Sequence, residues 1–525
     1  MSKPLAGVKV IEIAQEIQGP FAALFLSDLG AEITKVENRE TGDLSRWLLA
    51  GMLGGPNVKN PEVSHYFIAM NRGKRSLTVD LKKPQGIEVV RRLSKTHDVI
   101  LTNYRPGVLD RLGLGYDEIR KINPRIIYAQ ASSWDPRGPW VSRPSRDTLA
   151  QAASGLMSKT GMLADPPLAA GAAIADQAGA LTLASGVLAA LFARERTGEG
   201  QRVDASIYGT MIAAQGFELN YTSMTGTEPP KAGRGHPFLP GVWGAYRTRD
   251  GYICIAGVDD KRWADFCRVM GIEAMRDDPE FENVTRNFHG DKIEKVLDKI
   301  FPKRTTREWL DDLTAVDILV TEVASHKDVL ASEQARINGY ITQLNHPVVG
   351  KMAVTGCPVS LNGEITTEAG PVSEHGQHTE EILLEAAIRG RRLRRCAKPK
   401  RFKRGRRRAA HNSEASGAAY FSRRAARVIL PLSPDYAPVV KRTSRRSPEP
   451  QVRVRLPAGA LKPRKALALQ RVSQPSAASL ENSWQILGKF GRVLAANGGK
   501  FRIALKNSSR SSGRAGSLCA SLQRP

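Results

Sequence analysis

The sequence predicts an α/β protein with a large domain built on a parallel sheet and a smaller α+β domain after it. Two observations support this fold class. Segments rich in β-branched residues alternate with helical segments over the first 132 residues, and the later chain changes to a hairpin followed by helices. A chain of 525 residues is long enough to bury a core in each domain.

The large domain begins with a strand at 7–13, a helix at 21–30 and a second strand at 31–37. The alternation then continues with strands at 76–81, 98–103 and 125–132 and helices at 85–95 and 116–123. Strands joined by helices run parallel, and such sheets bind their ligands beyond the carboxyl ends of the strands. We therefore expect a ligand site at that edge.

Polar residues follow these strand ends. The loop after the first strand holds Gln15 and Gln18 but neither G-x-G-x-x-G nor G-x-x-x-x-G-K-[ST], which disfavours a dinucleotide-dependent oxidoreductase or an NTPase. Arg39, Lys82 and Asn103 follow the next three strands. Cations gathered at one edge of a sheet predict a site for an anionic ligand.

An aspartate precedes a long apolar helix predicted at 177–196. Asp176 stands where an N-cap residue is expected, and a glycine-rich turn at 197–200 ends the helix. The residues beside it have little or no side chain, namely Ala175, Ala178 and Gly179. An ordinary aspartate is ionised at neutral pH because its pKa is about 3.9, and a helix N-terminus favours the anion. Asp176 is therefore either a structural cap or a reactive carboxylate open to a ligand.

Composition divides the chain further. Residues 386–525 hold 34 of the 78 basic residues and four of the 52 acids, so residues 1–385 carry a net charge of −4 although the whole chain carries +26. The predicted parts are a large domain at 1–220, a linker with a glycine loop at 221–241, a small domain at 242–330, a return segment completing the large domain at 331–385, and a basic tail at 386–525. The small domain opens with a hairpin turning at 249–251.

The five cysteines form no C-x-x-C pair, and the histidines show no metal-ligand spacing, so we expect no metal and a reducing, cytoplasmic setting. We also expect no membrane segment, because no apolar run reaches the length of a span. The tail admits three interpretations: a nucleic-acid or membrane binder, a disordered extension, or the product of a shifted reading frame. Its lack of stacking aromatics favours the last two.

Nine ordered motifs resemble those of the family III CoA-transferases, the CaiB/BaiF type, which include formyl-CoA transferases and the related α-methylacyl-CoA racemases. The motifs are PLAGVKVIEI at residue 4, DLGAEITKVE at 28, KRSLTVDLK at 74, NYRPGVLDRLG at 103, QAASG at 151, TGEGQRVDAS at 197, GRGHPF at 233, DGYICIA at 250 and EHGQHTEEIL at 374. The resemblance covers most of residues 4–385. It implies a Rossmann-like large domain, an interlocked homodimer, and no permanently bound cofactor, with a coenzyme A thioester as substrate.

The resemblance also implies residue roles. Asp176 matches the nucleophile, which forms an aspartyl anhydride and then an aspartyl-CoA thioester while CoA moves from an acyl-CoA donor to a carboxylic acid acceptor. By the same resemblance, the CoA phosphates or adenosine contact Arg39, Lys82 and Arg111, and Asn103 forms a hydrogen bond to CoA. Gln18 lies at the acyl end, and the loop with Gly233 and Gly235 shelters the intermediate from water.

Two alternatives stay open. In the racemase branch a histidine precedes the acid at 147, whereas this chain has Arg146 before Asp147. A racemase inverts the α-carbon of its substrate by transferring protons on both sides, so an aspartate base that lacks the histidine on the other side inverts that carbon poorly. A transferase is therefore favoured, and Arg146 either faces an acceptor carboxylate or forms a surface salt bridge. The second alternative is a basic nucleic-acid-binding protein with an inactive enzyme-like body.

Overall fold

The computed structural model describes residues 3–48, 64–239, 242–282, 289–367, 369–386, 454–455, 502–507 and 518–523. These residues fall into two units, Met1–Gly405 and Arg406–Pro525. The first unit holds the predicted large and small domains, and the second holds most of the basic tail. The domain boundaries given above remain a prediction.

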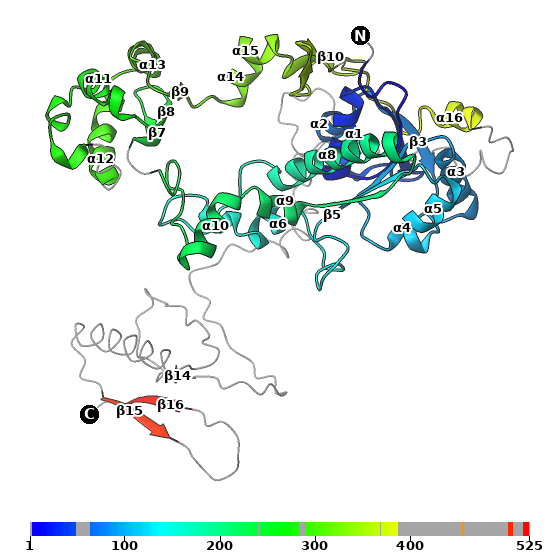
Figure 1. Cartoon of the computed structure of the whole chain (residues 1–525), viewed down its shortest axis with the longest axis horizontal. Helices are drawn as coiled ribbons and strands as arrows, with labels where there is room; N and C mark the ends of the chain where they lie inside the picture. Colours follow the sequence, from blue (N-terminus) through cyan, green and yellow to red (C-terminus); the bar gives the residue numbers. More distant parts are fainter. Residues whose placement is uncertain are drawn as a thin grey trace, which may run out of the picture. The chain divides into compact units, whose positions relative to one another are not determined.

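A parallel sheet of six strands forms the centre of the large domain (Figure 1), in the order β3-β2-β1-β4-β5-β6. The strands are β1 (Lys9–Ile13), β2 (Glu32–Asn38), β3 (Arg75–Val79), β4 (Val99–Thr102), β5 (Ile127–Ser132) and β6 (Arg202–Ser206). Every pairing within this sheet is parallel. The predicted α/β class and Rossmann-like strand order are confirmed.

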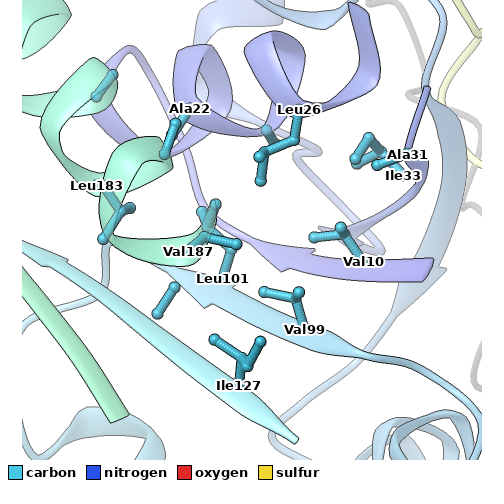
Figure 2. Close-up of a cluster of buried hydrophobic side chains, with 14 of the residues drawn as sticks. Val10, Ala22, Leu26, Ala31, Ile33, Val99, Leu101, Ile127, Leu183 and Val187 are labelled. Atoms are coloured by element: carbon cyan, nitrogen blue, oxygen red, sulfur yellow. The ribbon is translucent and has the colours of Figure 1, made fainter. Parts of the chain in front are cut away.

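Alternate strand residues point to opposite faces of this sheet, which gives it two cores. On one face, strand residues such as Val10 and Leu101 pack against α1 (Gln18–Asp28) and α8 (Ile174–Thr197), as Figure 2 shows. On the other face, strand residues pack against α3 (Pro84–Ser94), α5 (Tyr116–Ile122) and α16 (Thr379–Glu385); these residues include Ile11, Ile100 and Tyr128. The sheet is therefore covered on both sides, as parallel sheets require.

Helix α8 is, within the described residues, the one helix that is long and apolar enough to cross a membrane by length and composition. It packs along α1 and over β5 and β6, with Leu183 and Val187 fully buried. Core packing therefore accounts for the apolar side chains on the buried side of this helix. The helix ends at Gly198, which adopts φ +74°, so the predicted glycine stop is confirmed.

A second body of structure follows α10 (Gly216–Thr225). The antiparallel strands β7 (Trp243–Arg247), β8 (Tyr252–Ala256) and β9 (Val320–Glu322) pack with α11 (Asp260–Met270), α12 (Gly290–Ile300) and α13 (Thr306–Ala315) around a core of their own. The predicted hairpin is confirmed. The predicted linker differs at its start, because α10 extends to Thr225 and the irregular segment begins at Gly226.

Shorter elements complete the first unit: α2 (His65–Asn71), α4 (Val108–Arg111), α6 (Asp147–Ala153), α7 (Leu156–Lys159), α9 (Ile207–Ala213), α14 (His326–Ala331), α15 (Glu333–Ile337), β10 (Ile341–His346), β11 (Gly350–Thr355), β12 (Ser360–Leu361) and β13 (Glu364–Ile365). In the second unit, β14 (Val454–Arg455), β15 (Arg502–Asn507) and β16 (Leu518–Gln523) form a sheet in the order β14-β16-β15. The rest of the tail, on which the prediction of disorder falls, lies outside the described residues.

Candidate active site

Buried charges hold the loop that follows β1. Lys35 on β2 contacts Glu12 at 2.5 Å and Asp43 at 2.8 Å, and it donates to the Ala14 carbonyl. Burial alone would lower the pKa of Lys35, but the carboxylates of Asp43 and Glu12 raise it above its ordinary value. Lys74 contacts Glu12 at 2.7 Å and donates to the Pro20 carbonyl, so both ends of the loop rest on this network.

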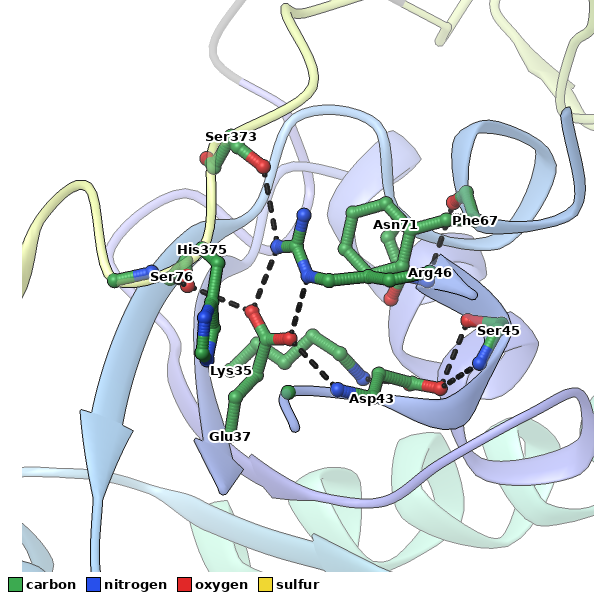
Figure 3. Close-up of polar contacts among 12 residues, drawn as sticks. Lys35, Glu37, Asp43, Ser45, Arg46, Phe67, Asn71, Ser76, Ser373 and His375 are labelled. Atoms are coloured by element: carbon green, nitrogen blue, oxygen red, sulfur yellow. Dashed lines mark hydrogen bonds and ion pairs between the residues drawn. The ribbon is translucent and has the colours of Figure 1, made fainter. Parts of the chain in front are cut away.

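A second buried ion pair ties the returning chain to the same edge. Arg46 donates to both oxygens of Glu37, at 2.7 and 2.8 Å, and to the Ser373 carbonyl at 3.1 Å (Figure 3). Ser76 adds a hydroxyl donor to Glu37. Burial raises the pKa of a carboxyl group, but the Arg46 guanidinium and its hydrogen bonds outweigh burial and hold the pKa of Glu37 at about 2.

Asn103 at the end of β4 fixes the backbone of the neighbouring loop. Its side-chain oxygen accepts from the Gln15 amide at 3.0 Å, and its side-chain nitrogen donates to the Gln15 carbonyl at 2.6 Å. Both ends of the Asn103 amide are therefore engaged with the loop. Its predicted hydrogen-bonding role towards CoA stays a prediction, and the structure adds this positioning role.

Glu16 follows in an unusual conformation. Its φ is +66°, a left-handed value that is rare for a residue with a side chain, and Asp43 accepts its backbone N–H. Its carboxylate contacts the Nη1 of Arg146 at 2.9 Å. The guanidinium of Arg146 is 69 % exposed, so the predicted surface salt bridge is present.

Asp176 lies in the first turn of α8, but it is not the N-cap. The helix begins at Ile174 with Ala173 as the cap residue, and that cap makes no side-chain hydrogen bond. The carboxylate that caps α8 comes from α6: Oδ2 of Asp147 accepts the N–H groups of Ala175 at 2.8 Å and Asp176 at 3.0 Å. The N-cap prediction for Asp176 was wrong because a distant carboxylate satisfies the helix end.

Asp147 is itself held in place. Its Oδ1 accepts from Nε2 of the buried Gln151 at 2.5 Å, and Oε1 of Gln151 accepts the Ala170 N–H at 2.9 Å. These contacts link α6, the segment that leads into α8, and the backbone of Asp176. Hydrogen bonds of this kind fix the direction in which the first turn of α8 points its side chains.

The environment of Asp176 differs from the sequence-based expectation. Burial raises the pKa of Asp176 to about 7, with the charges of Asp147 and Glu16 adding to the rise and Arg146 opposing it. This environment therefore raises the pKa of Asp176 above the ordinary aspartate value used in the sequence analysis and disfavours the ionised form. Burial and the charges of Glu16 and Asp176 also raise the pKa of Tyr66 on α2, which keeps its phenol neutral.

Gln18 lies beside the same turn of α8. It is buried at the start of α1 and donates to the Ala205 carbonyl at 3.4 Å. A Cβ at Gly179 would lie 3.2 Å from Nε2 of Gln18, so the absence of a side chain at 179 lets Gln18 approach the helix one turn beyond Asp176. The structure thus places Gln18 against the helix that carries Asp176, at Gly179.

The three residues predicted to contact the phosphates or adenosine of CoA come after strands of the large sheet. Arg39 comes directly after β2, and the exposed Lys82 follows β3. The exposed Arg111 closes α4, beyond β4. Because all strands are parallel, the segments that leave β2, β3 and β4 start from the same edge of the sheet as the loop after β1, and the CoA contacts of these three residues stay predictions.

The loop that carries Gly233 and Gly235 uses its N–H groups in hydrogen bonds to other parts of the protein backbone. Gly233 donates its N–H to the Gly161 carbonyl at 3.1 Å, and Gly235 donates to the Ala232 carbonyl at 3.2 Å. Arg234 between them binds both oxygens of Asp298 on α12, at 2.8 and 3.0 Å. In this conformation, the N–H groups of Gly233 and Gly235 are not presented to a ligand.

Sequence reasoning missed three contributors: Glu16, Tyr66 and the capping role of Asp147. Glu16 is separated from Arg146 by 130 residues, and Asp147 from Asp176 by 29, so no local pattern joins them. One signal was available: Asp147 is an acid in the first turn of α6, and such a carboxylate can accept N–H groups from the start of another helix. Nothing in the sequence around Tyr66 marks it.

Comparisons with known proteins identify the family of this chain. The family described as CoA-transferase family III matches residues 5–379. A succinyl-CoA:glutarate CoA-transferase from Mus musculus is 35% identical over 386 residues, covering 73% of this chain and 86% of the relative. An acetyl-CoA:oxalate CoA-transferase from Acetobacter aceti is 32% identical, covering 69% of this chain and 90% of that protein.

Solved structures give the same result. A crystal structure of a CAIB/BAIF family protein from Brucella suis superimposes with a TM-score of 0.65 at 28% identity, covering 74% of this chain and all of that one. The matched region ends at residue 379, before the basic tail. The chain therefore belongs to the CoA-transferase family III.

Proposed function

We propose that this chain transfers coenzyme A from an acyl-CoA thioester to a free carboxylic acid with Asp176 as the nucleophile. One observation carries the proposal: Asp176 lies in the first turn of α8 beside small residues, and within the described residues no hydrogen bond occupies its side-chain oxygens. Its pKa of about 7 leaves a substantial ionised fraction at neutral pH.

The first half-reaction moves CoA onto the protein. An Asp176 oxygen attacks the thioester carbonyl, the C–S bond breaks, and CoA leaves as a thiolate while an aspartyl acyl anhydride forms. The thiolate then attacks the aspartyl carbonyl of the anhydride. The bond between the aspartyl carbonyl carbon and the bridging oxygen of the anhydride breaks, the donor acid leaves as a carboxylate that keeps this oxygen, and an aspartyl-CoA thioester remains.

The second half-reaction runs the same steps in reverse order with the acceptor. The acceptor carboxylate attacks the aspartyl-CoA carbonyl, which again forms an anhydride and releases the CoA thiolate. The thiolate attacks the acceptor's acyl carbon, giving the new acyl-CoA and restoring the Asp176 carboxylate. Each intermediate hydrolyses readily, so the site must exclude water.

The surrounding residues suit an acyl-CoA. Arg39, Lys82 and Arg111 supply cations for the phosphates of CoA at the carboxyl edge of the sheet. Gln18 stands at the acyl end, beside the turn of α8 that carries Asp176. The loop with Gly233 and Gly235 is assigned the sheltering role by the family resemblance, and its glycine N–H groups have backbone acceptors in this conformation.

Four wider properties belong to the same proposal. We expect a homodimer in the cytoplasm, without a permanently bound cofactor, and a tail that catalysis does not need. Light scattering tests the dimer. Activity of a chain shortened after residue 385 tests the tail. Tight, salt-sensitive binding of the full chain to DNA without activity would instead support the nucleic-acid-binding alternative.

The test is a transfer assay. The full chain is incubated with pairs of acyl-CoA donors and free carboxylic acids, and new CoA thioesters are followed by mass spectrometry. Asp176→Ala should abolish transfer, whereas Asp117→Ala, which changes an exposed acid in the first turn of α5, should not. Exchange of the α-proton of an α-methylacyl-CoA without any CoA transfer would support a racemase instead.

A further inference from the structure

An irregular segment leads into the helix that carries Asp176. Residues 160–173 lie between α7 and α8 and form no helix or strand, and residues 166–172 are all exposed. We call residues 160–173 the entry segment. A stretch of chain with few buried contacts opens readily unless hydrogen bonds hold it. The contacts that hold the entry segment therefore bear on the surroundings of Asp176.

Lys231, two residues before the first glycine of the glycine loop, holds the middle of the entry segment. Its ammonium group donates to the Asp165 carbonyl at 2.7 Å and to the Pro166 carbonyl at 2.9 Å. The Asp165 carboxylate closes a turn by accepting the Met162 N–H at 2.7 Å. Hydrogen bonds from a charged donor are stronger than those between neutral groups. One side chain thus fixes two successive carbonyls of this turn.

Further hydrogen bonds join the same two stretches of chain. The Ala232 N–H donates to the Lys159 carbonyl at 2.8 Å. The Gly233 N–H donates to the Gly161 carbonyl at 3.1 Å. The ammonium group of Lys159 crosses in the opposite direction and donates to the Pro229 carbonyl at 3.0 Å. We call these contacts, together with those of the lysine at 231, the latch. It is held by one lysine from each side.

The far end of the entry segment is tied to the cap of α8. The Ala170 N–H donates to Oε1 of Gln151, and Nε2 of Gln151 donates to Asp147. Asp147 in turn accepts the Asp176 N–H at 3.0 Å. Because α8 begins at Ile174, the entry segment lies directly beside the turn that carries the proposed nucleophile. The latch therefore holds one side of the surroundings of this carboxylate.

We propose that Lys231 is a positioning residue that holds the entry segment against residues 228–233, and that this latch keeps water from the intermediates on Asp176. The inference rests on the proposed function. Water that attacks the aspartyl-CoA carbonyl forms a C–O bond and breaks the C–S bond, leaving the Asp176 carboxylate, CoA thiol and one proton. The acyl-CoA donor is then hydrolysed without transfer. Exclusion of water therefore sets the ratio of hydrolysis to transfer.

The experiment measures both products of the full chain in one reaction. Acetyl-CoA or succinyl-CoA is supplied with glutarate, or with the acid that reacts fastest in the transfer assay. The new thioester reports transfer, and free CoA thiol reports hydrolysis after subtraction of the Asp176→Ala background. We expect Lys231→Met to raise the ratio of hydrolysis to transfer roughly tenfold, because hydrogen bonds from a charged donor are lost. Lys231→Arg, which can still donate to two carbonyls, should keep the ratio within about twofold of the wild type.

Loss of folding alone lowers both products and leaves their ratio unchanged, so the ratio distinguishes positioning from stability. Lys292→Met is the matched control, because it removes an exposed lysine that pairs with Glu280 at 2.5 Å. It should not change the ratio.

A second variant disturbs the entry segment without removing a lysine. Gly161 has a φ of +93°, and a Cβ there would lie 2.8 Å from Cδ1 of Leu168 and 2.9 Å from Oδ2 of Asp165. Gly161→Ala should therefore raise the ratio in the same direction. Gly271→Ala is its control, since Gly271 has a φ of +66° at the end of α11 and open space around its Cβ position. That change strains the backbone but should leave the ratio alone.

The outcomes separate the two proposals. An unchanged ratio in Lys231→Met overturns the inference and leaves the transferase intact. If that variant does not fold, an unchanged ratio in Gly161→Ala overturns the inference equally. A comparable rise in Lys292→Met or Gly271→Ala also overturns it, because general loosening would then account for the effect. Absence of transfer by the wild type with every donor and acid overturns the proposed function and this inference together.

Discussion

The carboxylate of Asp147 caps the helix that carries Asp176, accepting the Asp176 N–H at 3.0 Å and the Ala175 N–H at 2.8 Å. The Asp147 carboxylate therefore binds the backbone of the residue whose side chain carries the second carboxylate, Asp176. It fixes the first turn of α8, and it places a negative charge beside the Asp176 side chain. One residue thus orients the proposed nucleophile and raises its pKa.

Asp147→Asn separates these effects. An asparagine oxygen still accepts from the helix end, but the charge is gone and the bond from Gln151 is weakened. We expect the apparent pKa of acyl transfer to fall below the wild-type value, with a stability loss of about 1 kcal/mol. Rates measured from pH 5 to pH 9 check this. Asp117→Asn, on the exposed first turn of α5, should leave the pH profile alone; an unchanged profile in Asp147→Asn would speak against the electrostatic role.

Asp176 should make stability depend on pH. Its folded-state pKa of about 7 lies above its unfolded value, so protonation favours the folded state. The stability from this group is present at low pH and is lost as the pH rises between about 4 and 7. Asp176→Asn should therefore unfold like the wild type at pH 4 and be more stable at pH 8, by on the order of 2 kcal/mol. A stability difference that does not change with pH would contradict this account.

Lys35 should be among the costliest single changes. Lys35→Met leaves Glu12 and Asp43 buried without the cation between them, and it removes the donor to the Ala14 carbonyl. Breaking a buried ion pair from one side costs about 3–5 kcal/mol. Urea unfolding at pH 7 measures the loss. Lys121→Met breaks an exposed pair with Glu118 and should leave the unfolding midpoint nearly unchanged; equal effects of the two changes would show that the buried network contributes little.

Gly200 should not tolerate alanine. A Cβ there would lie well inside contact distance of the Ile126 carbonyl oxygen, which is backbone and cannot move aside. Overpacking of this kind costs about 1–3 kcal/mol. Gly216→Ala at the start of α10 meets open space, and we expect it to be neutral or stabilising by up to about 1 kcal/mol. Thermal unfolding of both variants decides the matter, and similar midpoints would contradict the predicted clash.

The sheet could be predicted from the sequence because its signals are local. Alternating apolar segments, such as 98–103 and 125–132, mark β4 and β5 within a residue or two at each end, and the helices between them imply a parallel order. The carboxyl edge followed from that order. Arg39 and Lys82, which follow two of the strands, could therefore be expected at that edge.

The electrostatics of the site could not be predicted in this way. An aspartate at a helix start has a strong local preference for capping, yet the cap of α8 comes from Asp147 on another helix. The pairing of Glu16 with Arg146, and the left-handed backbone at Glu16, depend on how three loops meet. Contacts of this kind are properties of the folded chain and leave no periodic trace in the sequence.

The most direct test of the central claim is the intact mass of the protein after mixing with an acyl-CoA donor in the absence of an acceptor. The account predicts a covalent adduct of CoA, located by peptide mapping on Asp176, that disappears on addition of a carboxylic acid acceptor and does not form in Asp176→Asn. Transfer of CoA by the wild type with no adduct on Asp176, or undiminished transfer by Asp176→Asn, would contradict the assignment of Asp176 as the nucleophile.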